Sequence, residues 1–280
     1  MATVFGLLAV LFWGLLAVLS VYSKMVAPFQ LLALCLLLAS SLVYIYRFIR
    51  REKLFKKPEL SSKQWLIGIL GIFGFHFFYF MAIRHAPAIE VSLISYLWPL
   101  LLGVYVSPAS LIIRAIIGGG LGFLGIVILI QGSSSQIFNY ENIVGYLFAF
   151  SCAFIWSGYS WFLSKQKGNT EDISWVALVC GLLAFISHLI FEESNWALTN
   201  MEWISIVFLG LGPVGGAFYL WEIGMKKGNK RLLASLSFCA PILSAFALYI
   251  FGMGDFSLEI ISALSLILLG AFITNSKKIS

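Results

Sequence analysis

The sequence predicts an all-α integral membrane protein with ten transmembrane helices, arranged as two inverted five-helix repeats. Hydrophobic residues make up 61% of its 280 positions and charged residues only 11%, whereas soluble domains carry about 25% charged residues. Apolar segments follow one another along the whole chain, and a stretch of the first half recurs 142 positions later. These observations together define the expected fold class.

A transmembrane helix needs about 20 predominantly apolar residues, and ten segments of about that length can be counted. Their approximate ranges are 3–22, 29–49, 64–84, 88–106, 109–131, 143–164, 173–191, 203–225, 230–251 and 257–275. The loops between them are short, and no segment resembles a soluble domain. Residues 1–132 therefore form the first five-helix repeat and residues 143–280 the second, and both belong to one membrane domain.

The internal repeat is clearest in the third and fourth spans, which match the eighth and ninth. A shift of 142 positions pairs Gly74 with Gly216, Tyr79 with Trp221, Arg84 with Lys226, Ser95 with Ser237, and Pro99 with Pro241. Five spans per half is an odd number, so the second half enters the membrane from the opposite side. Inverted repeats of this kind are typical of secondary transporters, whose halves expose one site alternately to each side.

Charge distribution predicts the orientation of the chain. If the N-terminus is cytoplasmic, sixteen of the eighteen Lys and Arg residues fall in cytoplasmic loops, and only Lys24 and Arg84 fall outside. Cytoplasmic loops of membrane proteins carry such an excess, so both termini are expected in the cytoplasm. The net charge of +6 has this explanation, and no nucleic-acid partner is expected.

Polar side chains within the third and fourth spans are the candidate substrate-binding groups. His76 and Tyr79 are three residues apart and share a helix face, with aromatic residues around them. Polar groups at membrane depth face protein or a water-filled cavity, so the pair either lines a cavity or forms an interhelical hydrogen bond. Tyr96 and Trp98 follow in the next span. If only one of them reaches a cavity, we expect it to be Trp98.

Pro99 and Pro241 lie inside spans at equivalent positions of the two repeats. Each proline removes one helical hydrogen bond, and a freed carbonyl is tolerated where it is satisfied otherwise or lines a cavity. The symmetric placement favours a pair of hinges over a simple packing kink. Gly215 and Gly216, in a glycine-rich part of the eighth span, are a further candidate hinge, although small residues also allow close helix packing.

The remaining polar residues give weaker evidence of a functional role. Glu222, near the cytoplasmic end of the eighth span, is expected to reach the interface with Lys226, and His188 is expected at the outer interface. No zinc-protease, nucleotide-binding or serine-hydrolase motif with its partners is present. We therefore expect no enzyme activity, no catalytic residue, no metal site and no cofactor.

Several of these residues resemble a known family. The two-times-five layout, Trp13-Gly14 in the first span, and the Ala-Pro-Ala…Ser…Ser-Tyr-Leu-Trp-Pro run ending at Pro99 are similar to the drug/metabolite transporter superfamily, EamA type. His76 and Tyr79 together with residues 95–99 resemble the YddG-type aromatic amino-acid exporters. The chain departs from many EamA proteins after the fourth span, where Ser-Pro-Ala-Ser replaces a Gly-Glu-Arg-like turn.

The resemblance implies a ten-helix bundle in a bacterial inner membrane with a central cavity, exporting amino acids by alternating access. It places around that cavity five residues: His76, Tyr79, Tyr96, Trp98 and Trp156. The expected substrates are small amphipathic metabolites, most of all aromatic or other neutral amino acids. Exporters of cationic drugs or quaternary ammonium compounds, and a non-transporting membrane scaffold, are the alternatives. The oligomeric state is left open, and a monomer is compatible with the sequence.

The orientation can be tested by thiol labelling. Asn139 and Asn195 are predicted to lie in outward loops, so a cysteine replacing either one should react with a membrane-impermeant thiol reagent added outside intact cells. The unsubstituted protein, whose four cysteines fall in apolar segments, is the control. Labelling from the cytoplasmic side alone would contradict both the orientation and the inverted repeat.

Overall fold

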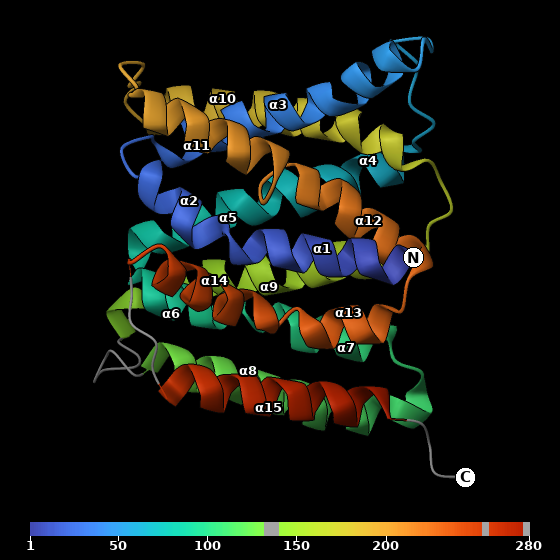
Figure 1. The fold of residues 1–280 in the computed structure, drawn as a ribbon, viewed down its shortest axis with the longest axis vertical. Coiled ribbons are helices and arrows are strands. Elements are labelled where there is room, and N and C mark those ends of the chain that lie inside the picture. The colour runs from blue at the N-terminus through green and yellow to red at the C-terminus, as the bar shows by residue number, and fades with distance from the viewer. Residues whose placement is uncertain (132–139, 254–257, 277–280) are drawn as a thin grey trace.

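The computed structural model describes residues 1–131, 140–253 and 258–276 as a bundle of roughly parallel and antiparallel helices (Figure 1). No β-strand occurs among these residues. Nine helical segments in this part of the chain are long and apolar enough to cross a membrane, and a bent pair, Lys230–Leu236 with Cys239–Ile250, accounts for the tenth span. The predicted all-α fold class is confirmed. Asn139 lies outside the described residues.

The first repeat contains α1 (Ala2–Gly14), α2 (Leu16–Tyr22), α3 (Pro28–Ile49), α4 (Ser62–Ile69), the π-helix η1 (Leu70–Gly74), α5 (Phe75–His85), α6 (Ala88–Ser95), α7 (Trp98–Val106), η2 (Ala109–Leu111) and α8 (Ile112–Gln131). The second contains η3 (Tyr140–Asn142), α9 (Ile143–Leu163), η4 (Thr170–Asp172), α10 (Ile173–Phe191), α11 (Asn200–Leu211), α12 (Gly216–Lys227), α13 (Lys230–Leu236), α14 (Cys239–Ile250) and α15 (Leu258–Asn275).

The two repeats interlock and do not form separate bodies. The helix pair α8 and α15 and the helix pair α3 and α10 each join equivalent spans of the two repeats. The contact of α1 with α12 is matched by that of α5 with α9, and the contact of α7 with α9 by that of α1 with α14. These reciprocal contacts are what a pseudo-twofold axis in the membrane plane requires.

Both ends of the bundle can be followed in Figure 1. The start of α1 and the end of α15 lie on the right-hand side of the view, which we call the terminal face. The short connection from α2 to α3 and the connection from α10 to α11 lie on the opposite side, which we call the far face. Arg114 near the terminal face donates hydrogen bonds to the carbonyl and the hydroxyl of Ser276, 3.1 and 3.3 Å away. The fifth span is thereby fixed to the tenth.

Helix breaks occur at equivalent places in the two repeats. The π-helix of the third span covers residues 70–74, and the eighth span is interrupted at residues 212–215, which is a shift of 142 positions. The fourth span breaks at residues 96–97, just before Pro99, and the ninth at residues 237–238, just before Pro241, with a bend of 44°. All four proposed hinge residues therefore lie at or beside a break in a membrane-spanning helix.

Glycine is required at the break of the eighth span. A Cβ atom on Gly215 would meet the carbonyl oxygen of Gly210, and one on Gly216 would meet that of Leu211. Close backbone approach also joins other helices, as where Gly224 of α12 lies against Gly6 of α1. Small residues make such contacts possible in lipid, where van der Waals packing drives helix association.

The substitution Gly215→Ala should therefore lower the melting temperature of the purified protein, by the equivalent of about 1–3 kcal/mol for an overpacked site. Gly158→Ala in α9 is the matched control, because a Cβ there meets no atom within 4 Å. Equal melting temperatures for the two variants would show that the break tolerates a side chain.

Candidate functional site

A central cavity of about 350 Å³ lies between the two repeats. Its walls come from α1, α2 and α3, from the third and fourth spans, and from the second repeat through α9, the eighth span and α14. The lining residues are Trp13, Leu16, Ser20, Pro28, Leu31, Leu32, Phe75, His76, Tyr79, Phe80, Ser92, Ser95, Tyr96, Trp98, Trp156, Leu209, Pro213, Val214, Phe218 and Ala240. The cavity extends toward the far face as far as Pro28, the first residue of α3.

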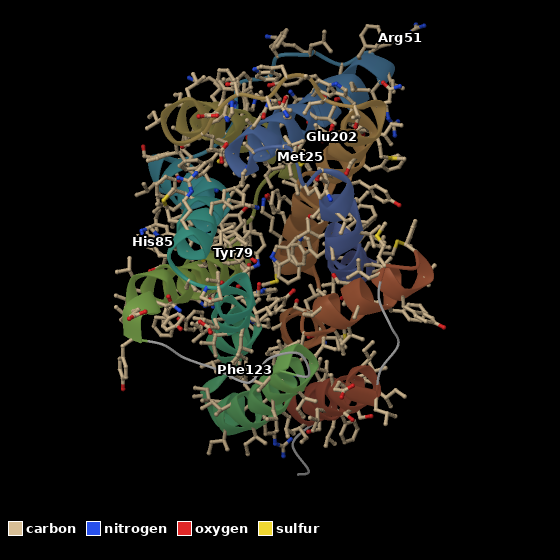
Figure 2. All side chains as sticks on the ribbon, turned by 90° about the vertical axis from the view of Figure 1, so that its left-hand side faces the viewer. Met25, Arg51, Tyr79, His85, Phe123 and Glu202 are labelled. Atoms are coloured by element: carbon tan, nitrogen blue, oxygen red, sulfur yellow. The ribbon has the colours of Figure 1, made fainter. Side chains whose placement is uncertain are left out.

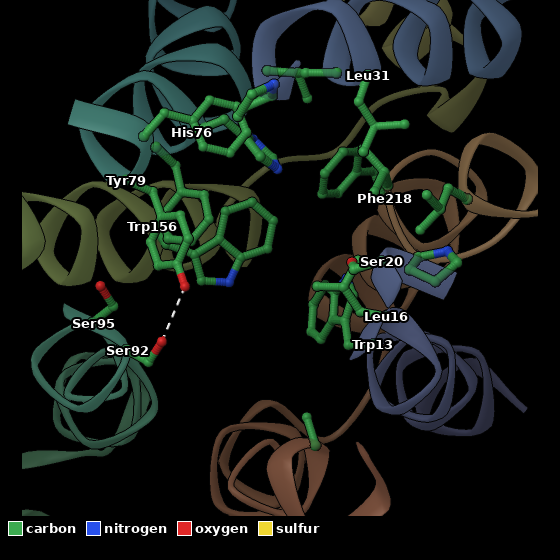
Figure 3. Close-up of a pocket in the computed structure, with 18 of the residues that line it drawn as sticks. Trp13, Leu16, Ser20, Leu31, His76, Tyr79, Ser92, Ser95, Trp156 and Phe218 are labelled. Atoms are coloured by element: carbon green, nitrogen blue, oxygen red, sulfur yellow. Dashed lines mark hydrogen bonds between the residues drawn. The ribbon is translucent and has the colours of Figure 1, made fainter. Parts of the chain in front are cut away.

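All five residues that the family resemblance placed at the candidate site line this one cavity, and His76, Tyr79 and Trp156 are labelled in Figure 3. The helix break at residues 96–97 explains how Tyr96 and Trp98 can both reach it, since a regular helix would turn residues two apart to different faces. Figure 2 shows Tyr79 within the bundle and Arg51 at its margin. Convergence of these side chains is a geometric finding, and their role in substrate binding stays a prediction.

Hydrogen bonds orient the polar groups of the cavity wall. The Tyr79 hydroxyl lies 3.0 Å from the Ser92 hydroxyl, across the turn that joins the third and fourth spans (Figure 3). His76 Nδ1 lies 2.7 Å from the carbonyl oxygen of Ile72 in the π-helix. A carbonyl oxygen can only accept a hydrogen bond, so Nδ1 carries a proton and Nε2 is the ring nitrogen left for another partner.

Four tryptophans form a layer at the end of the cavity that is nearer the terminal face. Trp13 contacts Trp98, Trp156 and Trp221, with ring centroids 6.1, 5.7 and 5.1 Å apart. Trp98 also contacts Trp156 and Trp221 in edge-to-face geometry, at 6.2 and 5.8 Å. Three of these rings are buried, and Trp221 Nε1 donates to the Ser160 hydroxyl at 3.0 Å. We call these four residues the tryptophan layer.

The cavity wall carries no formal charge. Among its described lining residues there is no Asp, Glu, Lys or Arg, and the polar ones are histidine, tyrosine, serine and tryptophan. Transfer of an ion into such surroundings is costly unless it is paired. An electrically neutral, amphipathic ligand with a flat apolar part suits these walls, because aromatic rings stack on other flat groups.

A second, smaller cavity of about 40 Å³ lies on the other side of the tryptophan layer. Its walls include Gln64, Tyr159, Asp172, Glu222 and Lys226. Tyr159 contacts Trp156, with ring centroids 5.5 Å apart, and so joins the walls of the two cavities along α9. The cavity on the far-face side of the tryptophan layer is therefore large enough for a ligand, whereas the cavity on the terminal-face side is much smaller.

Glu222 forms an ion pair with Lys226, as the spacing of four predicts, but the expectation that it reaches the interface is wrong. Both side chains are only 7% exposed, because α12 packs between α1 and α9 and the pair lies inside the bundle. Lys226 Nζ also donates to the Gly168 carbonyl at 3.3 Å. The pair thus helps close the terminal face.

His188 is also more buried than expected. It is fully buried, and its ring nitrogens lie 2.9 Å from a carboxylate oxygen of Glu192 and 2.9 Å from the Ser194 hydroxyl. The Glu192 carboxylate accepts hydrogen bonds from the backbone N–H groups of Phe29 and Gln30 at 3.0–3.2 Å. Phe29 and Gln30 lie in the first turn of α3, and a negative charge is favourable at a helix N-terminus. The network holds α3 to α10 at the far face.

Sequence reasoning missed several parts of the site. Phe75, Phe80 and Phe218 line the cavity, but in a chain with 25 phenylalanines nothing in the sequence singles them out. Trp221 could have been found, because the repeat pairs it with Tyr79. Its place in the tryptophan layer follows from the contact of α12 with α1, which the sequence does not reveal.

An interlocked pair of inverted repeats with broken helices around a mid-bundle cavity defines a class of protein, the multi-pass membrane transporters. The family comparison is specific. A profile of the EamA-like transporter family matches residues 1–131 and 143–276. The chain belongs to this family of transporters, which places it among membrane proteins with small-molecule substrates and not among enzymes.

Individual relatives agree with this assignment. The chain is 38% identical over 276 residues to the aromatic amino acid exporter YddG of Ancylobacter novellus, covering 96% of this chain and 95% of the relative. It is 23% identical to the protein of the same name from Escherichia coli, over 59% of each chain. A solved crystal structure superposes with a TM-score of 0.90 at 36% identity, covering 98% of this chain and 96% of that one.

The buried ion pair gives a stability prediction. Glu222→Gln should lower the melting temperature, because breaking a buried pair leaves one charge without its partner, at a cost of about 3–5 kcal/mol. The double variant Glu222→Gln, Lys226→Met removes both charges and should recover most of the loss. A double variant less stable than Glu222→Gln alone would contradict this account.

Proposed function

We propose that this protein exports aromatic and other neutral amino acids across a bacterial inner membrane by alternating access, with both termini in the cytoplasm. The observation that carries the proposal is an uncharged, aromatic cavity between inverted repeats, closed toward the terminal face by the tryptophan layer. The name of the 38% identical relative supports the same substrate class.

A zwitterion fits this cavity better than a cation. At neutral pH an aromatic amino acid carries opposite charges that cancel, so it brings no net charge into walls that hold none. Aromatic rings can attract a quaternary ammonium ion through cation–π contacts, and for that reason a cationic-drug exporter is the competing function. The described residues of the lining include no carboxylate to pair with such a cation, which favours the amino acid.

The direction of access follows from the positions of the two cavities. With the termini in the cytoplasm, the far face is the outer face, so the larger cavity belongs to an outward-facing state. The breaks beside Pro99, Pro241, Gly215 and Gly216 are the proposed hinges for the opposite state. Equivalent breaks in the two repeats allow the halves to exchange conformations, which is how inverted repeats alternate access.

Counterflow in proteoliposomes tests the function. Liposomes loaded with unlabelled phenylalanine, tryptophan, leucine, lysine or a quaternary ammonium compound should take up labelled phenylalanine only when the internal solute is a substrate. We expect exchange with the aromatic and neutral amino acids. A parallel assay uses a labelled quaternary ammonium compound outside and the same unlabelled compound inside. Exchange of that compound without exchange of phenylalanine would favour the drug exporter, and no exchange in either assay would favour the scaffold.

Trp98→Ala should reduce transport of an aromatic amino acid by about tenfold or more, with unchanged membrane expression. The variant loses an aromatic contact worth about 1 kcal/mol and the apolar area behind it. Phe55→Ala is the control, because Phe55 is exposed and outside the cavity. Transport of every tested solute at the normal rate would show that Trp98 only packs.

A further inference from the structure

A group of exposed basic side chains follows α3. Residues 50–57, which we call the basic segment, contain five Lys or Arg residues and one Glu, and all eight positions are exposed. Of these five, only Lys56 forms an ion pair with an acidic side chain of the described chain, that of Glu59 at 3.2 Å. The basic side chains without an acidic partner are those of Arg50, Arg51, Lys53 and Lys57.

The fold itself does not require these charges. The internal repeat pairs residues 50–57 with residues 192–199, which contain two Glu and no Lys or Arg. An excess of positive charge in cytoplasmic loops orients a membrane protein, but this effect needs no particular arrangement of the side chains. The basic segment does have a defined arrangement, which orientation alone leaves unexplained.

Hydrogen bonds from buried parts of the bundle hold the backbone of the basic segment in place. Arg47 is buried and pairs with Glu171 at 2.7 Å, and its Nη1 also donates to the Leu54 carbonyl at 3.1 Å. Trp175 Nε1 of α10 donates to the Lys56 carbonyl at 3.1 Å. The charged side chains therefore extend from a backbone that is attached to α3 and α10.

Arg51 has a backbone conformation that favours glycine. Its φ is 56°, and no other residue of the described chain except a glycine has a positive φ. Its N–H donates to the Phe48 carbonyl at 3.1 Å, and the Glu52 N–H donates to the Arg47 carbonyl at 2.9 Å. This is the helix-ending motif in which glycine is usual. Because an arginine is unfavourable for the backbone here, its side chain needs a role outside the helix end.

The surroundings of the basic segment indicate what that role is. The end of α3 lies at the upper right corner of the bundle in Figure 1, and Figure 2 places Arg51 at the margin of the molecule. Phe48 and Ile49 are 71% and 73% exposed. The Arg50 guanidinium lies 5.6 Å from the ring centroid of Tyr46, and tyrosine is enriched at membrane–water interfaces. Basic groups thus lie beside apolar side chains at the edge of a membrane-spanning bundle.

We infer that the basic segment binds the headgroup of an anionic phospholipid such as phosphatidylglycerol. Arg50, Arg51 and Lys53 supply the positive charge, and Phe48 and Ile49 contact the acyl chains. Basic clusters next to a membrane-spanning helix attract anionic lipids, and arginine can bind a phosphate group through two hydrogen bonds. The inference goes beyond the proposed function, because it does not depend on the transported substrate.

Lipid binding to the purified full-length protein in detergent is measured by native mass spectrometry. Dioleoylphosphatidylglycerol should bind more tightly than dioleoylphosphatidylcholine, whose choline cation opposes the basic side chains. Each Lys or Arg near an anionic headgroup changes the affinity about fivefold. The triple variant Arg50→Gln, Arg51→Gly, Lys53→Gln should therefore bind phosphatidylglycerol about 100-fold more weakly and phosphatidylcholine as before. Glycerol 3-phosphate, which has no acyl chains, should not displace the lipid.

A second triple variant, Lys165→Gln, Lys167→Gln, Lys227→Gln, is the matched control. It removes the same charge from exposed side chains near the same face, and it should keep the affinity for phosphatidylglycerol. Arg51→Gly alone should not lower the melting temperature in lipid-free detergent, because glycine favours a positive φ. A weaker affinity of the first variant then does not reflect unfolding.

Four results would overturn the inference. They are equal affinities of the unsubstituted protein for the two lipids, unchanged phosphatidylglycerol binding in the first triple variant, an equal loss in the control variant, and displacement of the lipid by glycerol 3-phosphate. Equal losses would indicate a general attraction of the whole face, and displacement would indicate a site for a soluble anion. Absence of amino-acid exchange in liposomes would contradict the proposed function and leave these lipid measurements unaffected.

Discussion

The packing of four tryptophans at mid-bundle is the contact on which the rest of the structure depends. Trp13, Trp98, Trp156 and Trp221 come from four different spans and from both repeats. Each aromatic pair adds about 0.5–1.5 kcal/mol beyond the area it buries. The layer divides the larger cavity from the smaller one, and under the proposed function it is the barrier between the two sides of the membrane.

The proposed function requires the tryptophan layer to open, and the backbone suggests where. The spans that frame the cavity are interrupted at equivalent positions of the repeats, so parts of a span can move without the whole helix. The long uninterrupted helices α8 and α15 pack along each other at the edge of the bundle. The account therefore expects the movement in the spans that carry the site.

Interactions at the two faces differ in kind. At the terminal face Lys226 pairs with Glu222 of the same helix and donates to the Gly168 carbonyl, which joins α12 to the loop after α9. At the far face the Glu192 carboxylate caps α3 and contacts His188. Ion pairs inside a protein add little net stability compared with apolar packing. Both ion pairs join residues four apart along the chain, so the contacts that link different helices at these faces are the hydrogen bonds of Lys226 to Gly168 and of Glu192 to the start of α3.

The sequence predicted the fold nearly in full, because hydropathy and helix length are local properties. It also predicted the breaks beside Pro99, Pro241 and Gly215–Gly216, because proline lacks an N–H group and glycine is flexible. It did not predict the π-helix at residues 70–74. It did not predict burial of Glu222 and His188, which depends on where neighbouring helices pack.

Accessibility of a cysteine inside the cavity tests the central claim most directly. Ser92→Cys places a thiol on the half-buried cavity wall, and the unsubstituted protein serves as the blank. Without substrate, an impermeant reagent should label it in intact cells and not in inside-out vesicles. Adding phenylalanine should increase labelling in the vesicles, because the tryptophan layer must part during transport. Labelling from the cytoplasmic side without substrate, or no change with it, would contradict the account.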